Sequence, residues 1–291
     1  MSEVKNPTPA PTVAAPKPVG SATATMAARS PLPPSLTKGN TNLMDTQWFR
    51  VCLYSEYKAR KTSTAARFSK PEDAFIVLTR SIEQLKPLEG SGYDYAHCKD
   101  ATALRYALMY PERVARDGWA TNQNRTLIVD DMTEAVSMLL TDARGGEDNT
   151  GFTRMRAHDR AGSELRDLLT SLRLKPQHLV VVALAKVRDN QITNEERVAP
   201  DLPPAMLNFV MTDLDHVFYI NPKTWQLLTE RHYFAYEDVD ASGKKQNYSR
   251  EIFASHKVPF GKAGKVLQKY ENLDLAAVWG KIRNGATTPT K

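Results

Sequence analysis

Short apolar runs alternate with amphipathic stretches between residues 46 and 220 of the chain. The runs are bounded by turn residues, as expected of strands that helices cover on both faces. They predict strands at Phe49–Tyr54, Ala74–Thr79, Thr126–Asp130, Leu179–Leu184 and His216–Ile220. Helical periodicity predicts helices at Lys61–Phe68, Ala101–Tyr110, Met132–Asp142 and Ser163–Leu172. Alternating strands and helices favour an α/β fold with a mainly parallel sheet flanked by helices.

The pattern changes beyond Asn221 to an alternation of polar and apolar residues. Such alternation is typical of strands with one solvated face, and Asp240–Lys244 supplies the turn between two of them. We therefore expect a C-terminal antiparallel β-hairpin that extends one edge of the sheet, followed by a helix.

The first 42 residues differ in composition from the rest of the chain. They consist mainly of Pro, Ala, Thr, Ser and Lys, so they cannot bury enough apolar surface to offset the entropy of ordering. The sequence thus predicts a disordered arm over residues 1–42 and a folded domain over residues 43–291.

Composition and charge narrow the classes of function. Hydrophobic residues make up 41% and charged residues 25% of the chain, which is ordinary for a soluble globular protein. No run approaches the roughly 18 consecutive apolar residues of a membrane span, so we expect no membrane contact. The net charge of +6 weakly favours a polyanionic partner, and the two cysteines show no metal-ligand or redox spacing.

The stretch SEYKARKTS lies where the first predicted strand passes into the first helix. A phosphate-binding loop, GxxxxGK followed by Ser or Thr, occupies such a place because backbone N–H groups and the helix dipole favour an anion there. On this pattern Ser55 and Arg60 replace the two glycines, and Lys61 and Thr62 match the last two positions. Lys61 would reach the β and γ phosphates and Thr62 would ligate Mg²⁺. Arg60 and Ser63 would flank them in the nucleotide site.

A second element, TLIVDDMTEA at residues 126–135, supports the same chemistry. An apolar strand that ends in a carboxylate can place a magnesium ligand beside the phosphate loop, and Asp130 fits this role. Asp131 can orient the attacking water as a catalytic carboxylate or cap the helix that begins at Met132, and both functions can hold together. We expect the strands that carry the two elements to end side by side.

These motifs belong to a longer series of blocks: KTSTAARF, PEDAFIVLTR, RTLIVDDMTEAV, RAGSELRDLLTSLRLKPQHLVVVALAKVRDN and APDLPPAMLNFVMTDLDHVFYI. The series, from Trp48 to Ile220, resembles the RecA-like or AAA-type P-loop ATPases encoded by tailed bacteriophages, some of which accompany single-strand annealing and recombination proteins. The resemblance implies a RecA-like P-loop core that binds ATP and Mg²⁺. It also places Lys186 and Arg188, just past the strand LVVVAL, where a sensor residue would contact phosphate.

The resemblance also implies a biological setting. It points to DNA replication or recombination, to a homo-oligomer, and to single-stranded DNA or a phage recombination or replication protein as partner. The implied location is the host cytoplasm or the virion. Residues 143–160 correspond to a mobile loop that can face DNA, with arginines suited to that contact at Arg144, Arg154, Arg156 and Arg160.

The replaced glycines make this a degenerate Walker A loop. A non-glycine residue held at positive φ costs about 1 kcal/mol or more, so Arg60 is the more demanding replacement. Arg60 either contacts phosphate itself, since a guanidinium binds phosphate in a bidentate manner, or stands in a loop that no longer holds a triphosphate. We therefore expect nucleotide binding with weakened or lost hydrolysis. The alternative is a non-enzymatic virion, assembly or DNA-binding protein built on a lapsed P-loop fold.

Overall fold

The computed structural model describes residues 48–145, 151–190, 195–239, 243, 245–256 and 266–287. All of them belong to one compact unit, Met44–Lys291. The disordered arm predicted for residues 1–42 lies outside the described residues, so the division of the chain at residue 42 stays a prediction. Within the described ranges, no helix has both the length and the apolar character needed to cross a membrane.

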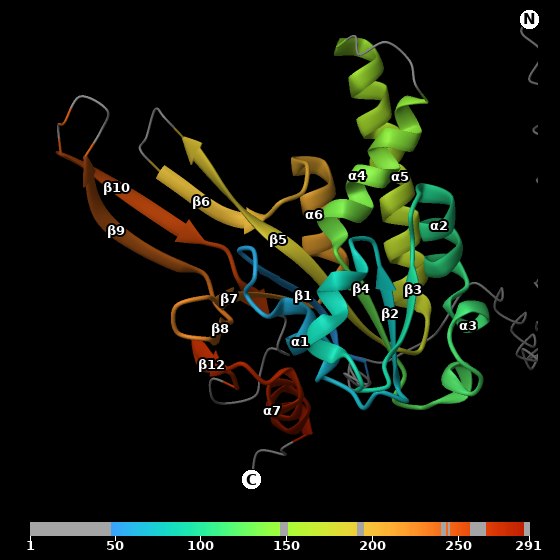
Figure 1. Ribbon diagram of the computed structural model, residues 1–291. Coiled ribbons are helices and arrows are strands. Elements are labelled where there is room, and N and C mark those ends of the chain that lie inside the picture. Colours follow the sequence, from blue (N-terminus) through green and yellow to red (C-terminus); the bar gives the residue numbers. More distant parts are fainter. Residues whose placement is uncertain are drawn as a thin grey trace, which may run out of the picture. The chain divides into compact units, whose positions relative to one another are not determined.

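A mainly parallel sheet forms the centre of the fold (Figure 1). Its parallel strands are β1 (Arg50–Ser55), β2 (Ala74–Leu78), β3 (Asp94–His97), β4 (Thr126–Asp130), β5 (His178–Asn190) and β7 (His216–Asn221). They lie in the order β7, β1, β5, β4, β2, β3. Antiparallel strands continue the sheet beyond β7: β8 (Gln226–Leu228), β11 (Ser255–His256) and β12 (Tyr270–Asn272).

Helices cover both faces of this sheet. One face carries α1 (Lys61–Ala66), the 3-10 helix η2 (Ile82–Leu88) and α7 (Leu275–Thr287). The other carries α2 (Ala101–Met109), α4 (Met132–Arg144), α5 (Gly151–Leu174) and α6 (Pro204–Asp213). The short helices α3 (Pro111–Val114) and η3 (Trp119–Thr121) connect α2 to β4. Side chains of β1 alternate between the two cores, because Val51 and Leu53 face the first group of helices and Cys52 and Tyr54 the second.

The predicted fold class is confirmed, since the parallel sheet between two helical layers is the arrangement of a RecA-like P-loop core. The predicted strands and helices are present, with ends that differ by a few residues, except that α5 begins at Gly151. Arg154, Arg156 and Arg160 therefore lie on a helix, and the loop expected across residues 143–160 is wrong from residue 151 onward. Residues 151–162 contain three Arg, two Ala and one Met, all of which favour helix. Residues 146–150 lie outside the described residues.

The predicted C-terminal hairpin is also present, as β9 (His232–Val239) and β10 (Lys245–Ile252). Its expected place at an edge of the main sheet is wrong. The hairpin pairs through β6 (Glu195–Pro200) with the outer half of β5, a central strand, and projects away from the core (Figure 1). The reason is the length of β5: its outer half runs past the ends of β1 and β4 and offers unpaired backbone groups, which β6 takes up.

Candidate functional site

The loop between β1 and α1 has a left-handed backbone at two residues that are not glycine. Ser55 is buried, and its Oγ donates a hydrogen bond of 2.6 Å to the Ile220 carbonyl oxygen of β7. This bond ties the start of the loop to the neighbouring strand. Lys58 and Arg60 have positive φ angles of 63° and 55°. The chain therefore adopts a left-handed backbone at Arg60, where the pattern has its second glycine.

The loop and the carboxylate strand meet through one side-chain contact. Thr62 Oγ1 donates a hydrogen bond of 2.6 Å to Asp130 Oδ2. The expectation that β1 and β4 end side by side is wrong, because β5 lies between them. The two motifs still come together because α1 lies over β5 and also contacts β4.

The pair formed by Thr62 and Asp130 fits the ligand chemistry of Mg²⁺. The ion prefers hard oxygen ligands, and it takes one or two from the protein while water and phosphate complete its shell. Burial raises the pKa of Asp130 to about 6, an effect that the Thr62 hydroxyl opposes. At neutral pH the carboxylate is thus ionised yet poorly solvated, which favours a cation beside it. Mg²⁺, when bound, neutralises charge on the phosphates.

Lys61 is folded onto the loop itself. Its Nζ donates to the carbonyl oxygens of Ser55 at 3.2 Å and Glu56 at 2.6 Å. Burial lowers the pKa of Lys61 to about 8, while Asp131 and Asp130 act in the opposite direction. The ammonium group is therefore charged at neutral pH and is held over the cavity by two neutral carbonyls, which a phosphate group would outcompete.

The Arg60 side chain contacts an aromatic residue that lies outside the predicted phosphate site. The centre of its guanidinium lies 4.5 Å from the ring centre of Trp225, in the turn between β7 and β8. Ser63 Oγ donates a hydrogen bond of 3.0 Å to the Arg60 carbonyl oxygen, so Ser63 contacts the loop backbone at the start of α1. Arg60 and Ser63 therefore both lie at the loop, and the Arg60 guanidinium stacks on an aromatic ring.

Asp131 caps α4, as the second of its two predicted functions requires. Its side chain accepts a hydrogen bond of 2.6 Å from the Thr133 N–H, and Arg80 Nε lies 3.5 Å from its Oδ2. Thr79 Oγ1 also donates to the Asp131 carbonyl oxygen at 2.7 Å. Burial raises the pKa of Asp131, and Arg80 opposes that rise. The capping prediction is confirmed, while orientation of water by Asp131 stays a prediction.

The two candidate sensor residues lie farther out along β5. Lys186 Nζ is 3.3 Å from Asp201 Oδ1, and the Arg188 guanidinium donates to the Leu202 carbonyl oxygen. Of the β5 residues that the structure describes, Leu184 lines the cavity at the loop and these two do not. The structure therefore does not bring Lys186 and Arg188 together with Lys61.

A cavity of about 580 Å³ joins the predicted residues. Arg60, Lys61, Thr62, Ser63, Asp130 and Asp131 all contribute to its wall. Sequence reasoning missed the residues that form the rest of it, which include Tyr57, Arg67, Arg80, Glu83 and Gln84. The position of Arg80 directly after a predicted strand was a usable signal, because parallel strands end at the same edge of a sheet. The residues of η2 carry no comparable pattern.

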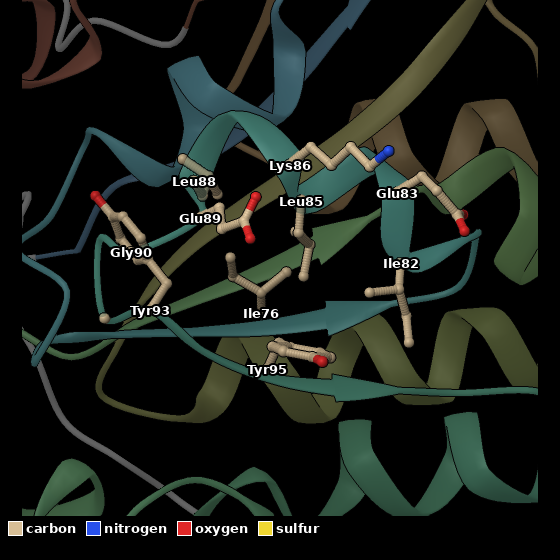
Figure 2. Close-up of a pocket in the computed structure, with 11 residues that line it drawn as sticks. Ile76, Ile82, Glu83, Leu85, Lys86, Leu88, Glu89, Gly90, Tyr93 and Tyr95 are labelled. Carbon is tan, nitrogen blue, oxygen red and sulfur yellow. The ribbon is translucent and has the colours of Figure 1, made fainter.

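The 3-10 helix η2 forms the wall between this cavity and a second one of about 420 Å³ (Figure 2). Leu85 and Leu88 reach down from η2 toward Ile76 of β2, as Figure 2 shows, and Leu88 and Ile76 belong to the same buried core. Glu83 contributes to both cavities. Apolar packing thus fixes the helix that closes the outer side of the phosphate loop cavity.

Comparisons with known proteins give a family match over most of the chain. Residues 48–250 match the protein family described as AAA domain. No curated protein matches the chain. One solved structure that is similar in fold is a prototypical ATPase from the type III secretion system of pathogenic bacteria, with 12% sequence identity and a TM-score of 0.40. That similarity covers 60% of this chain and 51% of the secretion ATPase, so the chain matches about half of that protein's length. Because the family match spans well over half of the sequence, the chain belongs to the AAA domain family of P-loop ATPases.

Proposed function

We propose that the protein binds Mg-ATP in the cavity at the phosphate loop and hydrolyses it slowly or not at all. The observation that carries the proposal is the hydrogen bond of 2.6 Å between Thr62 and Asp130. It joins two motifs that lie 68 residues apart in sequence and places two magnesium ligands next to the lysine of the loop. Members of the family bind ATP with Mg²⁺, and the cavity volume of about 580 Å³ suits a ligand of nucleotide size.

Each residue then has a defined part in binding. Lys61 exchanges the carbonyl oxygens of Ser55 and Glu56 for phosphate oxygens, which bind an ammonium group more strongly. Thr62 and Asp130 hold Mg²⁺. Gln84 of η2 also lines the cavity and would offer its side-chain amide to the bound nucleotide.

Slow hydrolysis follows from the state of Asp131. A general base needs an acceptor that is free to take a proton from the attacking water. Asp131 already accepts from the Thr133 N–H and lies beside Arg80, and its side chain is 4% exposed. These contacts support weakened turnover, because one carboxylate oxygen of Asp131 accepts from the Thr133 N–H and the other lies beside the positive charge of Arg80.

We propose a role in phage DNA replication or recombination. The order of the sequence blocks supports it, and so does a net charge of +6. In this proposal the protein is a homo-oligomer in the host cytoplasm or the virion, and its partner is single-stranded DNA or a phage recombination or replication protein. Lys186 and Arg188 serve as sensors only if the nucleotide or a second subunit brings phosphate to β5.

A second candidate function is a non-enzymatic virion, assembly or DNA-binding protein with a lapsed nucleotide site. The observation that favours it is the closed arrangement of the loop, in which Lys61 is satisfied by backbone carbonyls and Arg60 occupies a glycine position. In this alternative the protein acts by binding partners through its surface, and the cavity at the phosphate loop binds no nucleotide.

Thermal melting with and without Mg-ATP separates the two candidates. Ligand at 100 times its Kd stabilises the native state by about 2.7 kcal/mol, which gives a clear rise in Tm. The proposal predicts this rise for the wild type, its loss in Lys61→Ala and its retention in Lys70→Ala, an exposed lysine outside the cavity. No rise at millimolar Mg-ATP, or an equal rise in Lys61→Ala, would exclude nucleotide binding at this loop.

Retention of single-stranded DNA at increasing salt tests the DNA role. Contacts with phosphates weaken steeply with salt because bound counterions are released. We expect retention at 50 mM salt and its loss at a few hundred millimolar, whereas no retention at low salt would exclude single-stranded DNA as a direct partner.

A further inference from the structure

Two residues in unusual backbone conformations face each other beside the phosphate loop. Arg60 has a φ of 55° and so has Trp225, although neither is glycine. Their side chains are stacked, with the centre of the Arg60 guanidinium 4.5 Å from the ring centre of Trp225. A bulky residue at positive φ is rare and persists only where the surrounding structure holds it there.

The sheet places Trp225 at this position. Strand β7 pairs directly with β1, so the turn after β7 lies next to the loop after β1. The hydrogen bond from Ser55 Oγ to the Ile220 carbonyl oxygen joins the two ends. The ring of Trp225 is therefore presented to the phosphate loop by neighbouring parallel strands.

The turn that carries Trp225 is itself well fixed. The Trp225 N–H donates a hydrogen bond of 2.9 Å to the Asn221 carbonyl oxygen. Asn221 Oδ1 accepts hydrogen bonds from the N–H groups of Lys223 at 2.9 Å and Thr224 at 3.4 Å. Since its backbone is held on both sides, the turn provides a firm platform for the indole ring.

The stacking also determines where the Arg60 side chain goes. Arg60 lines the cavity that Lys61, Thr62 and Asp130 share and Trp225 does not, so a guanidinium over the Trp225 ring is held at the edge of that cavity. The Arg60 carbonyl oxygen accepts from Ser63 Oγ at 3.0 Å and from the Thr64 N–H at 2.9 Å, which fixes the peptide that follows. Side chain and backbone of Arg60 are thus restrained by separate contacts.

We propose that Trp225 is a positioning residue for the phosphate loop. By stacking on Arg60 it stabilises the left-handed backbone at the position of the pattern's second glycine, and it holds the guanidinium at the edge of the phosphate site. This inference rests on the proposed function and deepens it, because it explains how a loop without glycines stays able to bind a triphosphate. Loss of Trp225 frees the Arg60 guanidinium to move from the edge of the cavity toward Lys61, and it lowers the fraction of molecules that are competent to bind.

The opposing arrangement is direct contact between Arg60 and phosphate. In that case Arg60 leaves Trp225 when the nucleotide binds, and the stacking competes with binding. Removal of Trp225 would then tighten binding, and removal of Arg60 would weaken it. The two arrangements thus predict opposite signs for the same substitutions.

The test is a set of Mg-ATP affinities for the wild type, Trp225→Ala, Trp225→Phe, Arg60→Gly and the double variant of Trp225→Ala with Arg60→Gly. We expect Trp225→Ala to weaken binding about two- to fivefold, and Trp225→Phe, which keeps an aromatic ring, to remain near the wild type. Arg60→Gly binds at least as tightly as the wild type, and the double variant matches Arg60→Gly. Tighter or unchanged binding in Trp225→Ala, or weaker binding in Arg60→Gly, overturns the proposal.

Urea midpoints of the same proteins separate this inference from the proposed function. If the wild type binds no Mg-ATP, the proposed function fails, but the pairing can still be measured. The inference predicts that Trp225→Ala lowers the midpoint in the wild type and has little effect in the Arg60→Gly background. Equal losses in both backgrounds overturn it. Thr224→Ala, an exposed side chain in the same turn, is the control and should leave the midpoints and affinities unchanged.

Discussion

The left-handed backbone of Arg60 should affect the free energy of unfolding whether or not nucleotide is bound. Arg60 has a φ of 55° and a ψ of 22°. At most positions a glycine variant is less stable than an alanine variant, because glycine loses more conformational freedom on folding. At residue 60 we expect the reverse order, with Arg60→Gly more stable than Arg60→Ala.

The magnitude follows from the contacts of Arg60. Both variants lose the cation–π contact with Trp225, which is worth about 0.5–1 kcal/mol at an exposed site. Alanine keeps the left-handed strain of about 1–2 kcal/mol, and glycine relieves it at an entropic cost of about 0.5–1 kcal/mol. Arg60→Ala should therefore be less stable than the wild type by about 0.5–1 kcal/mol, and Arg60→Gly should lie close to the wild type.

Equilibrium unfolding in urea, followed by circular dichroism, measures these differences. Arg67 provides a matched control in the same segment, because its φ of −67° and ψ of −6° are right-handed. There Arg67→Gly should be less stable than Arg67→Ala. If Arg60→Ala is as stable as Arg60→Gly, or if both positions show the same order, the left-handed conformation at Arg60 is refuted.

Three further predictions concern the ligands and charges of the cavity. Thr62→Ala should lose at least tenfold in Mg²⁺-dependent ATP affinity, whereas Thr62→Ser, which keeps the hydroxyl, should lose little; calorimetric titration checks both. Mg-ATP affinity should fall below about pH 6, because protonated Asp130 cannot ligate Mg²⁺, and above about pH 8, because Lys61 loses its charge. Titrations from pH 5 to 9 should therefore show the highest affinity between these two values, and an affinity that does not change with pH would contradict the prediction. Arg80→Ala should destabilise the fold by about 1–3 kcal/mol at pH 7.5, since it leaves the buried Asp131 carboxylate unpaired. That loss should shrink in urea unfolding at lower pH as Asp131 takes up a proton, and a loss independent of pH would assign it to packing alone.

Local sequence patterns predicted the central strands and missed the peripheral ones for a physical reason. β1, β4 and β5 are buried on both faces, so they are visible as continuous apolar runs. β3 is an edge strand of four residues, and each of its residues is only partly buried or exposed. The hairpin of β9 and β10 was predicted, but its attachment to β5 depends on how far β5 extends past its neighbours.

The candidate site shows the same division between local and long-range information. Lys61, Thr62 and Asp130 were predicted because each stands at a fixed offset from a strand end. Arg80 and Trp225 were missed, since their roles arise from β2 beside β4 and β7 beside β1. Spacing within each βα unit thus predicted Lys61, Thr62 and Asp130. The order of the strands in the sheet determines which residues, Arg80 and Trp225, lie beside them.

Calorimetric titration of ATP into the wild-type protein, with Mg²⁺ and with EDTA in its place, tests the central claim most directly. The account predicts binding at one site per chain with Mg²⁺, and at least tenfold weaker binding with EDTA, because Thr62 and Asp130 hold the metal and Lys61 holds the phosphates. No measurable heat at millimolar ATP, or equal affinity with and without Mg²⁺, would contradict it.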